Sequence, residues 1–208
     1  MTFPDRVAVL LDGEYVKKTL QKKTKRFPSA DDVMDEVKRI LTDLSLARLT
    51  LYRIFYYTAD PLAGKTTHPL SGAQIDFAAS VVFSRNTQLI DKLENQHDVA
   101  VRRGTLAHQG WEIGHSAVRS LLGGTKNAVV ARDVLPKIQQ KGVDMRIGLD
   151  IASLALKRLV STVVVVTGDS DLVPAMKLAR REGLRVYLDT LGNRSTRPEL
   201  RIHADRIL

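Results

Sequence analysis

Four consecutive valines at residues 163–166 run directly into the cluster Thr-Gly-Asp-Ser-Asp. A stretch that is apolar at every position is typical of a strand buried on both faces, as in the middle of a parallel sheet. Two carboxylates, Asp169 and Asp171, follow this strand at once. A surface turn accounts for the glycine, but it does not account for two acids so close together. The stretch therefore predicts a central strand that ends in a functional loop.

Strand-like and helix-like segments alternate along the chain, which predicts an α/β fold with a largely parallel sheet. We expect strands at 7–13, 49–60, 99–107, 163–167 and 185–190, and helices at 29–44, 73–95, 144–158, 170–181 and 197–208. Ser29, with Asp32 three residues later, predicts a capping box for the first of these helices, and Ser170 is the expected cap of a later one.

Two segments lack such periodicity. Residues 61–72 are rich in Pro, Gly and Thr, which indicates a mobile loop. Residues 108–132 contain four glycines and predict a hairpin or a flexible insertion. We interpret residues 1–208 as one domain that carries this insertion.

The amino-acid composition excludes several kinds of functional site and favours one class of partner. The 208 residues include no cysteine, which excludes disulfides, thiolate zinc sites and cysteine nucleophiles. The net charge of +9 favours a polyanionic partner, nucleic acid first. No apolar run approaches the roughly 20 residues of a membrane span, and no signal peptide is visible. We therefore expect a cytoplasmic protein that does not enter membranes.

The acids at the strand ends are expected to converge. Asp12 ends the strand at 7–13, and Asp169 and Asp171 follow the strand at 163–167. In parallel sheets, ligands bind beyond the carboxyl ends of the strands, so neighbouring strands would bring these acids together. Clustered carboxylates repel one another unless a cation joins them, and oxygen-rich sites suit Mg²⁺ or Mn²⁺. Each acid alone also has a structural explanation, as a turn residue or at a helix N-terminus.

A further acid is expected from the helix at 144–158. Asp150 lies three residues after Ile147 and four before Leu154, so it shares their buried face and needs a partner or a function. Asp144 lies about 120° around the helix from Asp150, so both cannot reach one ion from a regular helix. Asp144 can reach the site from the turn that enters the helix, or it can be an N-cap. We rank Asp150 slightly above Asp144 as a metal ligand.

Four stretches resemble the NYN family, a branch of the PIN-like nucleases, in its bacterial form. They read VAVLLDGEYV, QKGVDMRIGLDIASLAL, VVVVTGDSDLVPAMKLARREGLRVYL and RPELRIHADRI, and they occur in the family's order. The resemblance implies a three-layer α/β/α fold and an acidic site for divalent metal. Many characterised relatives cut RNA, so it also implies RNA cleavage.

Carried over residue by residue, the resemblance assigns five acids to the metal site: Asp12, Asp144, Asp150, Asp169 and Asp171. Thr167 stands where the family has Ser and keeps the hydroxyl. Tyr15 stands where the family often has Asn, so an amide that could bridge the metal shell or a phosphate is missing. Activity can therefore be weaker, altered or lost. Glu14 is a speculative replacement.

Spacing and resemblance together predict hydrolysis of phosphodiester bonds, with single-stranded RNA as the expected substrate. One or two Mg²⁺ or Mn²⁺ ions would activate water and neutralise phosphate charge. We expect Asp12, Asp150 and Asp169 to bind metal directly. Asp144 and Asp171 are expected to act through water or by orientation, with Asp171 counted among the catalytic acids. Thr167 and Tyr15 are expected to support them.

A dense basic segment begins five residues after Asp12 and can steer a phosphate backbone toward the acids. Its cations are Lys17, Lys18, Lys22, Lys23, Lys25 and Arg26. The alternative is a solvated helix face. Arg102 and Arg103 are weaker candidates for the same role. Trp111, Tyr56 and Tyr57 can in principle stack bases, although the two tyrosines lie in a strand and at least one should be core.

Two other functions stay open from the sequence. A non-catalytic RNA-binding or regulatory module would keep the acidic pocket without cutting, and the missing Asn supports it. A phosphatase or small-nucleotide hydrolase would use the same acids, but the large positive charge favours a longer anion. Homodimerisation is plausible, without a visible interface.

Overall fold

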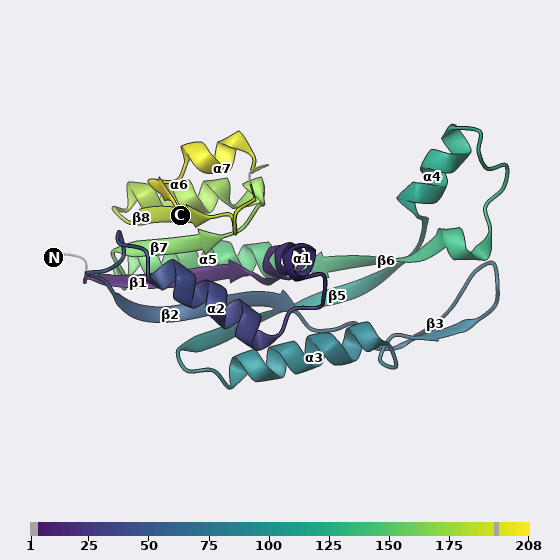
Figure 1. Cartoon of the computed structure of the whole chain (residues 1–208), viewed down its shortest axis with the longest axis horizontal. Helices are drawn as coiled ribbons and strands as arrows, with labels where there is room; N and C mark the ends of the chain where they lie inside the picture. Colours follow the sequence, from purple (N-terminus) through teal and green to yellow (C-terminus); the bar gives the residue numbers. More distant parts are fainter. Residues whose placement is uncertain (1–3, 194–195) are drawn as a thin grey trace.

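A seven-stranded sheet forms the centre of the protein, which is described by a computed structural model over residues 4–193 and 196–208 (Figure 1). The strand order is β6-β5-β2-β1-β7-β8-β9. Their bounds are β1 Arg6–Asp12, β2 Thr50–Ala59, β5 Val99–Ile113, β6 Val134–Lys141, β7 Thr162–Val166, β8 Arg185–Asp189 and β9 Arg206–Ile207. Neighbouring strands are parallel except β5 and β6. The predicted α/β class with a largely parallel sheet is confirmed.

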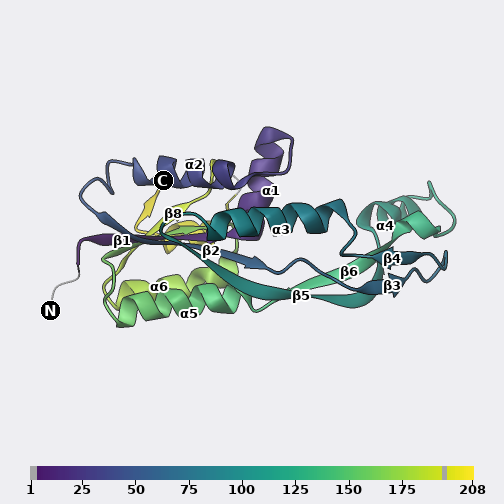
Figure 2. The ribbon, with the colours of Figure 1, turned by 90° about the horizontal axis from the view of Figure 1, so that it is seen from below.

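Helices cover both faces of this sheet, which gives the three layers that the resemblance implies (Figure 2). One face carries α1 (Gly13–Thr24), α2 (Ala30–Leu41) and α3 (Val81–Glu94), and the other carries α5 (Val143–Leu156) and α6 (Val173–Arg181). Within the described ranges, no helix combines the length and apolar character needed to cross a bilayer.

The buried strands supply both cores by alternation. Val9 and Leu11 of β1 pack in the core beneath α1, α2 and α3, whereas Ala8 and Leu10 pack in the core beneath α5 and α6. The valines of β7 alternate between the two cores in the same way. Successive side chains of a strand point to opposite faces, so a strand covered on both sides must be apolar throughout. This explains the valine run at 163–166.

Strands β5 and β6 extend beyond the sandwich as an antiparallel arm (Figures 1 and 2). Helix α4 (His115–Leu122) and the short 3-10 turn η1 (Ala131–Asp133) lie at its far end, beside the hairpin of β3 (Lys65–Thr67) and β4 (Gln74–Asp76). Contacts of His68 with the Val134 carbonyl, at 3.2 Å, and with the Trp111 ring join the hairpin to the arm. Residues 108–132 therefore divide between the end of β5, α4 and the turns that lead to β6.

Several predicted element bounds are wrong. The helix expected at 73–95 begins only at Val81, because the Ser80 hydroxyl caps it through the Phe83 amide at 3.1 Å. Ser170 does not cap a helix: Asp169 caps the 3-10 turn η2 (Ser170–Leu172), and α6 starts at Val173. In the tail, α7 (Pro198–Ile202) ends early and residues 206–207 pair with β8 as β9. Helix α1 and strand β6 have no counterpart in the predicted elements.

The predicted capping box of α2 is confirmed. Ser29 accepts a hydrogen bond from the Asp32 amide at 3.2 Å, and Asp32 accepts one from the Ser29 amide at 2.6 Å. Arg26 adds two hydrogen bonds of 2.6 Å to the Asp32 carboxylate. The Arg26 hydrogen bonds, followed by those from Ser29, outweigh burial and lower the pKa of Asp32 from 3.8 to about 2. The ionised carboxylate is therefore part of the folded structure.

Asp32→Asn is expected to remove a pH-dependent part of the stability. Because the folded-state pKa lies below the unfolded value of 3.8, the carboxylate stabilises the fold above that pH, and its contribution is lost as pH falls toward 2. The difference in free energy of unfolding between wild type and variant should be constant above about pH 5 and shrink below pH 4. Urea unfolding at a series of pH values measures it. Asp35→Asn, in an exposed pair with Lys38, is the control and should change little.

Candidate active site

Two of the predicted acids lie at one edge of the sheet. Asp12 is the last residue of β1 and the N-cap of α1, and Asp169 follows β7 after a short turn. Strands β1 and β7 are parallel neighbours, with Leu11 opposite Val166. The expected convergence depends on this adjacency, which the structure shows.

A chain of hydrogen bonds ties the two strand ends together. The fully buried Thr167 donates its hydroxyl to one Asp12 carboxylate oxygen at 3.1 Å and accepts the Asp169 amide at 3.0 Å. Asp169 in turn accepts the Asp171 amide at 3.0 Å, and the Tyr15 amide donates to the other Asp12 oxygen at 3.2 Å. Thr167 therefore fixes the orientation of Asp12 relative to the loop that carries the other acids.

Burial and like charges both act on Asp12. Burial is the main cause that raises its pKa above 3.8, and the negative charges of Asp144 and Asp169 raise it further. Hydrogen bonds from Tyr15 and Thr167 lower the pKa but do not offset burial. Hydrogen bonds thus fix the orientation of the Asp12 carboxylate, while no ion pair with a described residue offsets its charge.

Asp144 belongs to the same electrostatic group. It lies in the first turn of α5, two residues after Gly142, whose left-handed φ of 77° sets the entry to the helix. Although much of its surface is exposed, partial burial and then the charges of Asp169 and Asp171 raise its pKa. In the described part of the chain, no Lys or Arg forms an ion pair with Asp12, Asp144, Asp169 or Asp171.

Asp150 has different neighbours. One of its carboxylate oxygens accepts hydrogen bonds from Arg102 and from the Tyr57 hydroxyl, each at 2.9 Å. Arg102 also lies over the Phe55 ring, 5.2 Å from its centroid. Asp150 therefore pairs with a cation on β5. The charge of Asp144 raises the pKa of Asp12.

Tyr15 turns its hydroxyl away from the acids. That hydroxyl donates to the Thr190 carbonyl at 2.7 Å, and burial is the main cause of its raised pKa. Its ring covers Gly168, where an added Cβ would come within 2.5 Å of the ring. The hydrogen bond between Tyr15 and Asp12 comes from the Tyr15 backbone amide. The aromatic residue at the family's Asn position thus anchors the loop after β8.

Most of the predicted phosphate-binding cations are engaged in ion pairs. Lys17 and Lys18 both pair with Glu14, at 3.1 and 3.2 Å. The other pairs are Lys23 with Glu36, Arg26 with Asp32, Arg102 with Asp150, and Arg103 with both Asp60 and Glu94. Lys22 and Lys25 have no ion pair with the residues that the structure describes. Among the predicted stacking residues, Tyr56 and Tyr57 are fully buried, and Trp111 lies on the arm.

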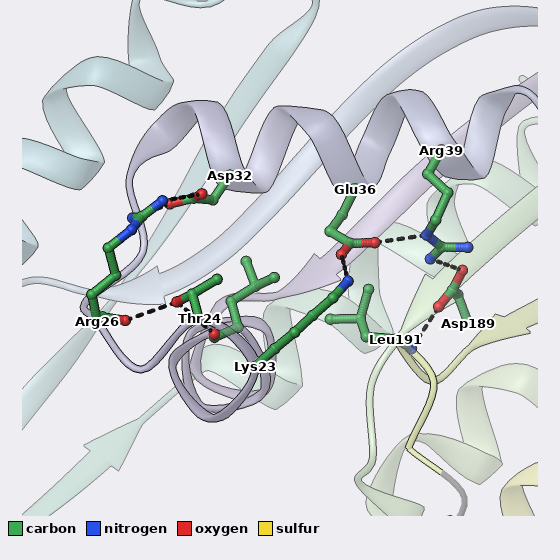
Figure 3. A network of polar contacts seen from close by, with 9 residues as sticks. Lys23, Thr24, Arg26, Asp32, Glu36, Arg39, Asp189 and Leu191 are labelled. Atoms are coloured by element: carbon green, nitrogen blue, oxygen red, sulfur yellow. Dashed lines mark hydrogen bonds and ion pairs between the residues drawn. The ribbon is translucent and has the colours of Figure 1, made fainter.

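A network that sequence reasoning missed lies close to this edge (Figure 3). Arg39 of α2 joins Glu36 to Asp189 at the end of β8, with 2.6 Å to each carboxylate. The Asp189 side chain is only 1% exposed and also accepts the Leu191 amide at 2.6 Å. An acid at a strand end was a visible signal here too. Arg39 pairs with Asp189, whereas Asp12 forms no ion pair with a cation in the described ranges.

The NYN domain family matches residues 6–208. This chain belongs to the NYN domain family. The resemblance inferred from the sequence is confirmed, and with it a PIN-like nuclease fold. Nucleases of this superfamily act on nucleic acid and generally depend on divalent metal.

One curated protein and one solved structure are similar to this chain. An uncharacterized protein, y4oD, of Sinorhizobium fredii is 42% identical over 71 residues, which is 32% of this chain and 32% of that protein. The match thus spans about a third of the curated relative. A crystal structure of a protein of unknown function, VPA0982, from Vibrio parahaemolyticus superposes with a TM-score of 0.51 over 100% of this chain and 94% of the other. At 13% identity, this likeness shows the fold alone.

The acids of this NYN domain match a divalent metal in their chemistry. Among residues 4–193 and 196–208, no three His, Asp or Glu side chains are arranged to hold a metal ion. The donor set of Asp12, Asp144, Asp169 and Asp171 is nevertheless all oxygen, as Mg²⁺ and Mn²⁺ prefer. Burial, and then the repulsion of neighbouring acids, raises the pKa of Asp12 and Asp144, and a bound cation would offset both effects. Binding would have to bring these carboxylates closer together.

Proposed function

We propose that this NYN protein is a Mg²⁺- or Mn²⁺-dependent nuclease that hydrolyses phosphodiester bonds in single-stranded RNA. The observation that carries the proposal is the group of four acids, Asp12, Asp144, Asp169 and Asp171, at the carboxyl edge of the sheet without a cationic partner in the described structure. Carboxylates with a raised pKa in such a position, as Asp12 and Asp144 are, are typical of functional sites. The net charge of +9 favours a long polyanion over a small phosphate ester.

The residues of the site would have different roles in metal binding and in the orientation of water. Asp12, fixed by Thr167 and the Tyr15 amide, and Asp169 would hold the metal from the two strand ends. Asp144 would join them from α5, in place of the Asp150 that sequence spacing ranks first. The bound ion would supply Lewis acidity and lower the pKa of its water. Asp171, two residues after Asp169, would orient that water. Asp150 would instead position Arg102 and Tyr57.

Purified protein incubated with labelled single-stranded RNA, duplex RNA and single-stranded DNA tests this proposal. Cleavage of single-stranded RNA is expected with Mn²⁺ or Mg²⁺, none with EDTA, and a loss of at least about 100-fold in Asp169→Asn. The Asp169→Asn variant keeps the size of the side chain and can still accept the Asp171 amide. Cleavage that persists in EDTA, or at the wild-type rate in the variant, would refute the metal-dependent nuclease.

One observation favours a second candidate, a non-catalytic RNA-binding module. The Tyr15 hydroxyl is committed to the Thr190 carbonyl, so the side chain at the family's Asn position does not serve the acids. The same assay separates the two functions. Tight binding of RNA without metal-dependent products would identify the binding module, and products lost in Asp169→Asn would identify the nuclease.

A further inference from the structure

A cavity of about 590 Å³ lies between α1, α3, the end of β2 and the middle of β5 and β6. Its walls include three phenylalanines from separate segments: Phe27 after α1, Phe77 before α3, and Phe83 within α3. We propose that this cavity receives an unstacked base of single-stranded RNA, next to the nucleotide that is cut. The inference rests on the proposed function, because the RNA is the proposed substrate.

The phenylalanines give the cavity an aromatic lining that is open to a ligand. All three are half-buried, so part of each side chain stays accessible. Bases stack favourably on such rings, and the gain is largely independent of sequence. Gln21 and Gln140 also line the cavity, and their side chains form no hydrogen bond with the described residues. Each amide can donate to and accept from the edge of a base.

Charge identifies the occupant as nucleic acid. Lys17, Lys18 and Arg85 line the same cavity as the phenylalanines. A second cavity of about 490 Å³ shares Phe27 and Arg85 with the first and adds further cations, Lys25, Arg26 and Lys92. An apolar peptide would gain nothing from this row of cations, whereas a strand with one phosphate per base would match it.

Several of these cations are available to an incoming phosphate. Lys25, Arg85 and Lys92 form no ion pair with any residue in the described ranges. Arg85 and Lys92 are seven residues apart on α3, so they lie on the same face of that helix. The two cavities therefore form one track, with bases held near Phe83 and phosphates along α3.

The position of the cavity connects it to the acids. Glu14 lines the cavity and lies two residues after Asp12, at the start of α1. Thr58 and Ala59, also in the lining, directly follow Tyr57, which pairs with Asp12 across the sheet. The cavity thus opens at the same carboxyl edge where the acids lie. A strand whose scissile phosphate meets the acids can place a neighbouring base in it.

Binding of a fluorescent eight-nucleotide single-stranded RNA in EDTA tests the base site apart from catalysis. Phe83→Ala is expected to raise the Kd by about 5- to 50-fold, and Phe83→Tyr, which keeps the ring, by less than about twofold. With an oligonucleotide of the same length that carries abasic riboses, wild type and Phe83→Ala should bind equally weakly. Val81→Ala, at an exposed position of the same helix outside the cavity, is the matched control.

The outcomes separate this inference from the nuclease proposal. If Phe83→Ala binds the normal RNA as wild type does, while wild type cuts it with metal, the base site is refuted and the nuclease stands. If Phe83→Ala weakens binding of abasic and normal strands equally, base stacking is refuted as well. If wild type neither binds nor cuts any of the nucleic acids, both proposals fail together.

Discussion

Asp144→Asn is expected to lower the rate of RNA cleavage roughly 100- to 1,000-fold, whereas Asp150→Asn should lower it less than about tenfold. Asp144 acts electrostatically on Asp12 and is itself affected by Asp169 and Asp171. Asp150 is instead satisfied by Arg102 and Tyr57. Steady-state cleavage of labelled single-stranded RNA in Mn²⁺ measures both variants. Each variant is the size-matched control of the other on the same helix.

Stability provides a second readout for the same pair. The raised pKa of Asp144 means that its ionised form destabilises the metal-free fold above the unfolded pKa of 3.8, and increasingly so up to the folded-state pKa. Asp144→Asn should therefore raise the free energy of unfolding in EDTA at neutral pH. Asp150→Asn should lower it by about 1 kcal/mol, because Arg102 loses its partner. Saturating Mn²⁺ should stabilise wild type more than Asp144→Asn. The opposite order of activities, with Asp144→Asn active and Asp150→Asn inactive, would restore the ranking by helix spacing.

The parts of the fold that depend on local pattern were predictable from the sequence. The valine run and the acids after it place β7, its buried surroundings and Asp169, because burial on both faces leaves no polar alternation. The rule that ligands bind beyond the carboxyl ends of parallel strands predicts where the acids meet, provided that β1 and β7 are neighbours. The structure shows that they are neighbours. Helix α1 was missed because its many lysines mask the short apolar face of Val16 and Leu20. In the described structure, the edge strand β6 pairs with β5 alone and leaves Leu135 and Ile138 exposed, so it has no core pattern to detect.

The parts that depend on distant partners were not predictable. An acid on a buried helix face needs a partner or a function, and Asp150 has a partner in Arg102. The sequence does not indicate this partner, because Arg102 lies 48 residues away. Arg39 and Asp189 are separated by 150 residues. In each case the sequence shows the acid and not the cation that neutralises it. The ion pairs of Asp150 and Asp189 are therefore visible only in the tertiary structure.

Arg39→Ala is expected to lower the free energy of unfolding by about 3 kcal/mol. Among the described residues, the substitution leaves the nearly inaccessible Asp189 carboxylate with the Leu191 amide alone, and Glu36 with Lys23 alone (Figure 3). A buried charge that loses its partner keeps its desolvation cost, which is the main part of the loss. For a chain of 208 residues this corresponds to a drop in Tm of about 6–12 °C. Thermal and urea unfolding measure the two quantities.

Lys38→Ala, one residue away on α2, is the matched control for the Arg39 network. Lys38 pairs with Asp35, and both side chains are at least 70% exposed, so water screens the pair and its loss should cost less than about 0.5 kcal/mol. The double variant Arg39→Ala with Asp189→Asn should recover part of the loss, because the neutral amide no longer needs a cation. Equal effects of Arg39→Ala and Lys38→Ala would show that Asp189 is not stabilised by Arg39. No recovery in the double variant would assign the loss to the packing of the Arg39 side chain, because that packing stays absent when Asp189 is neutral.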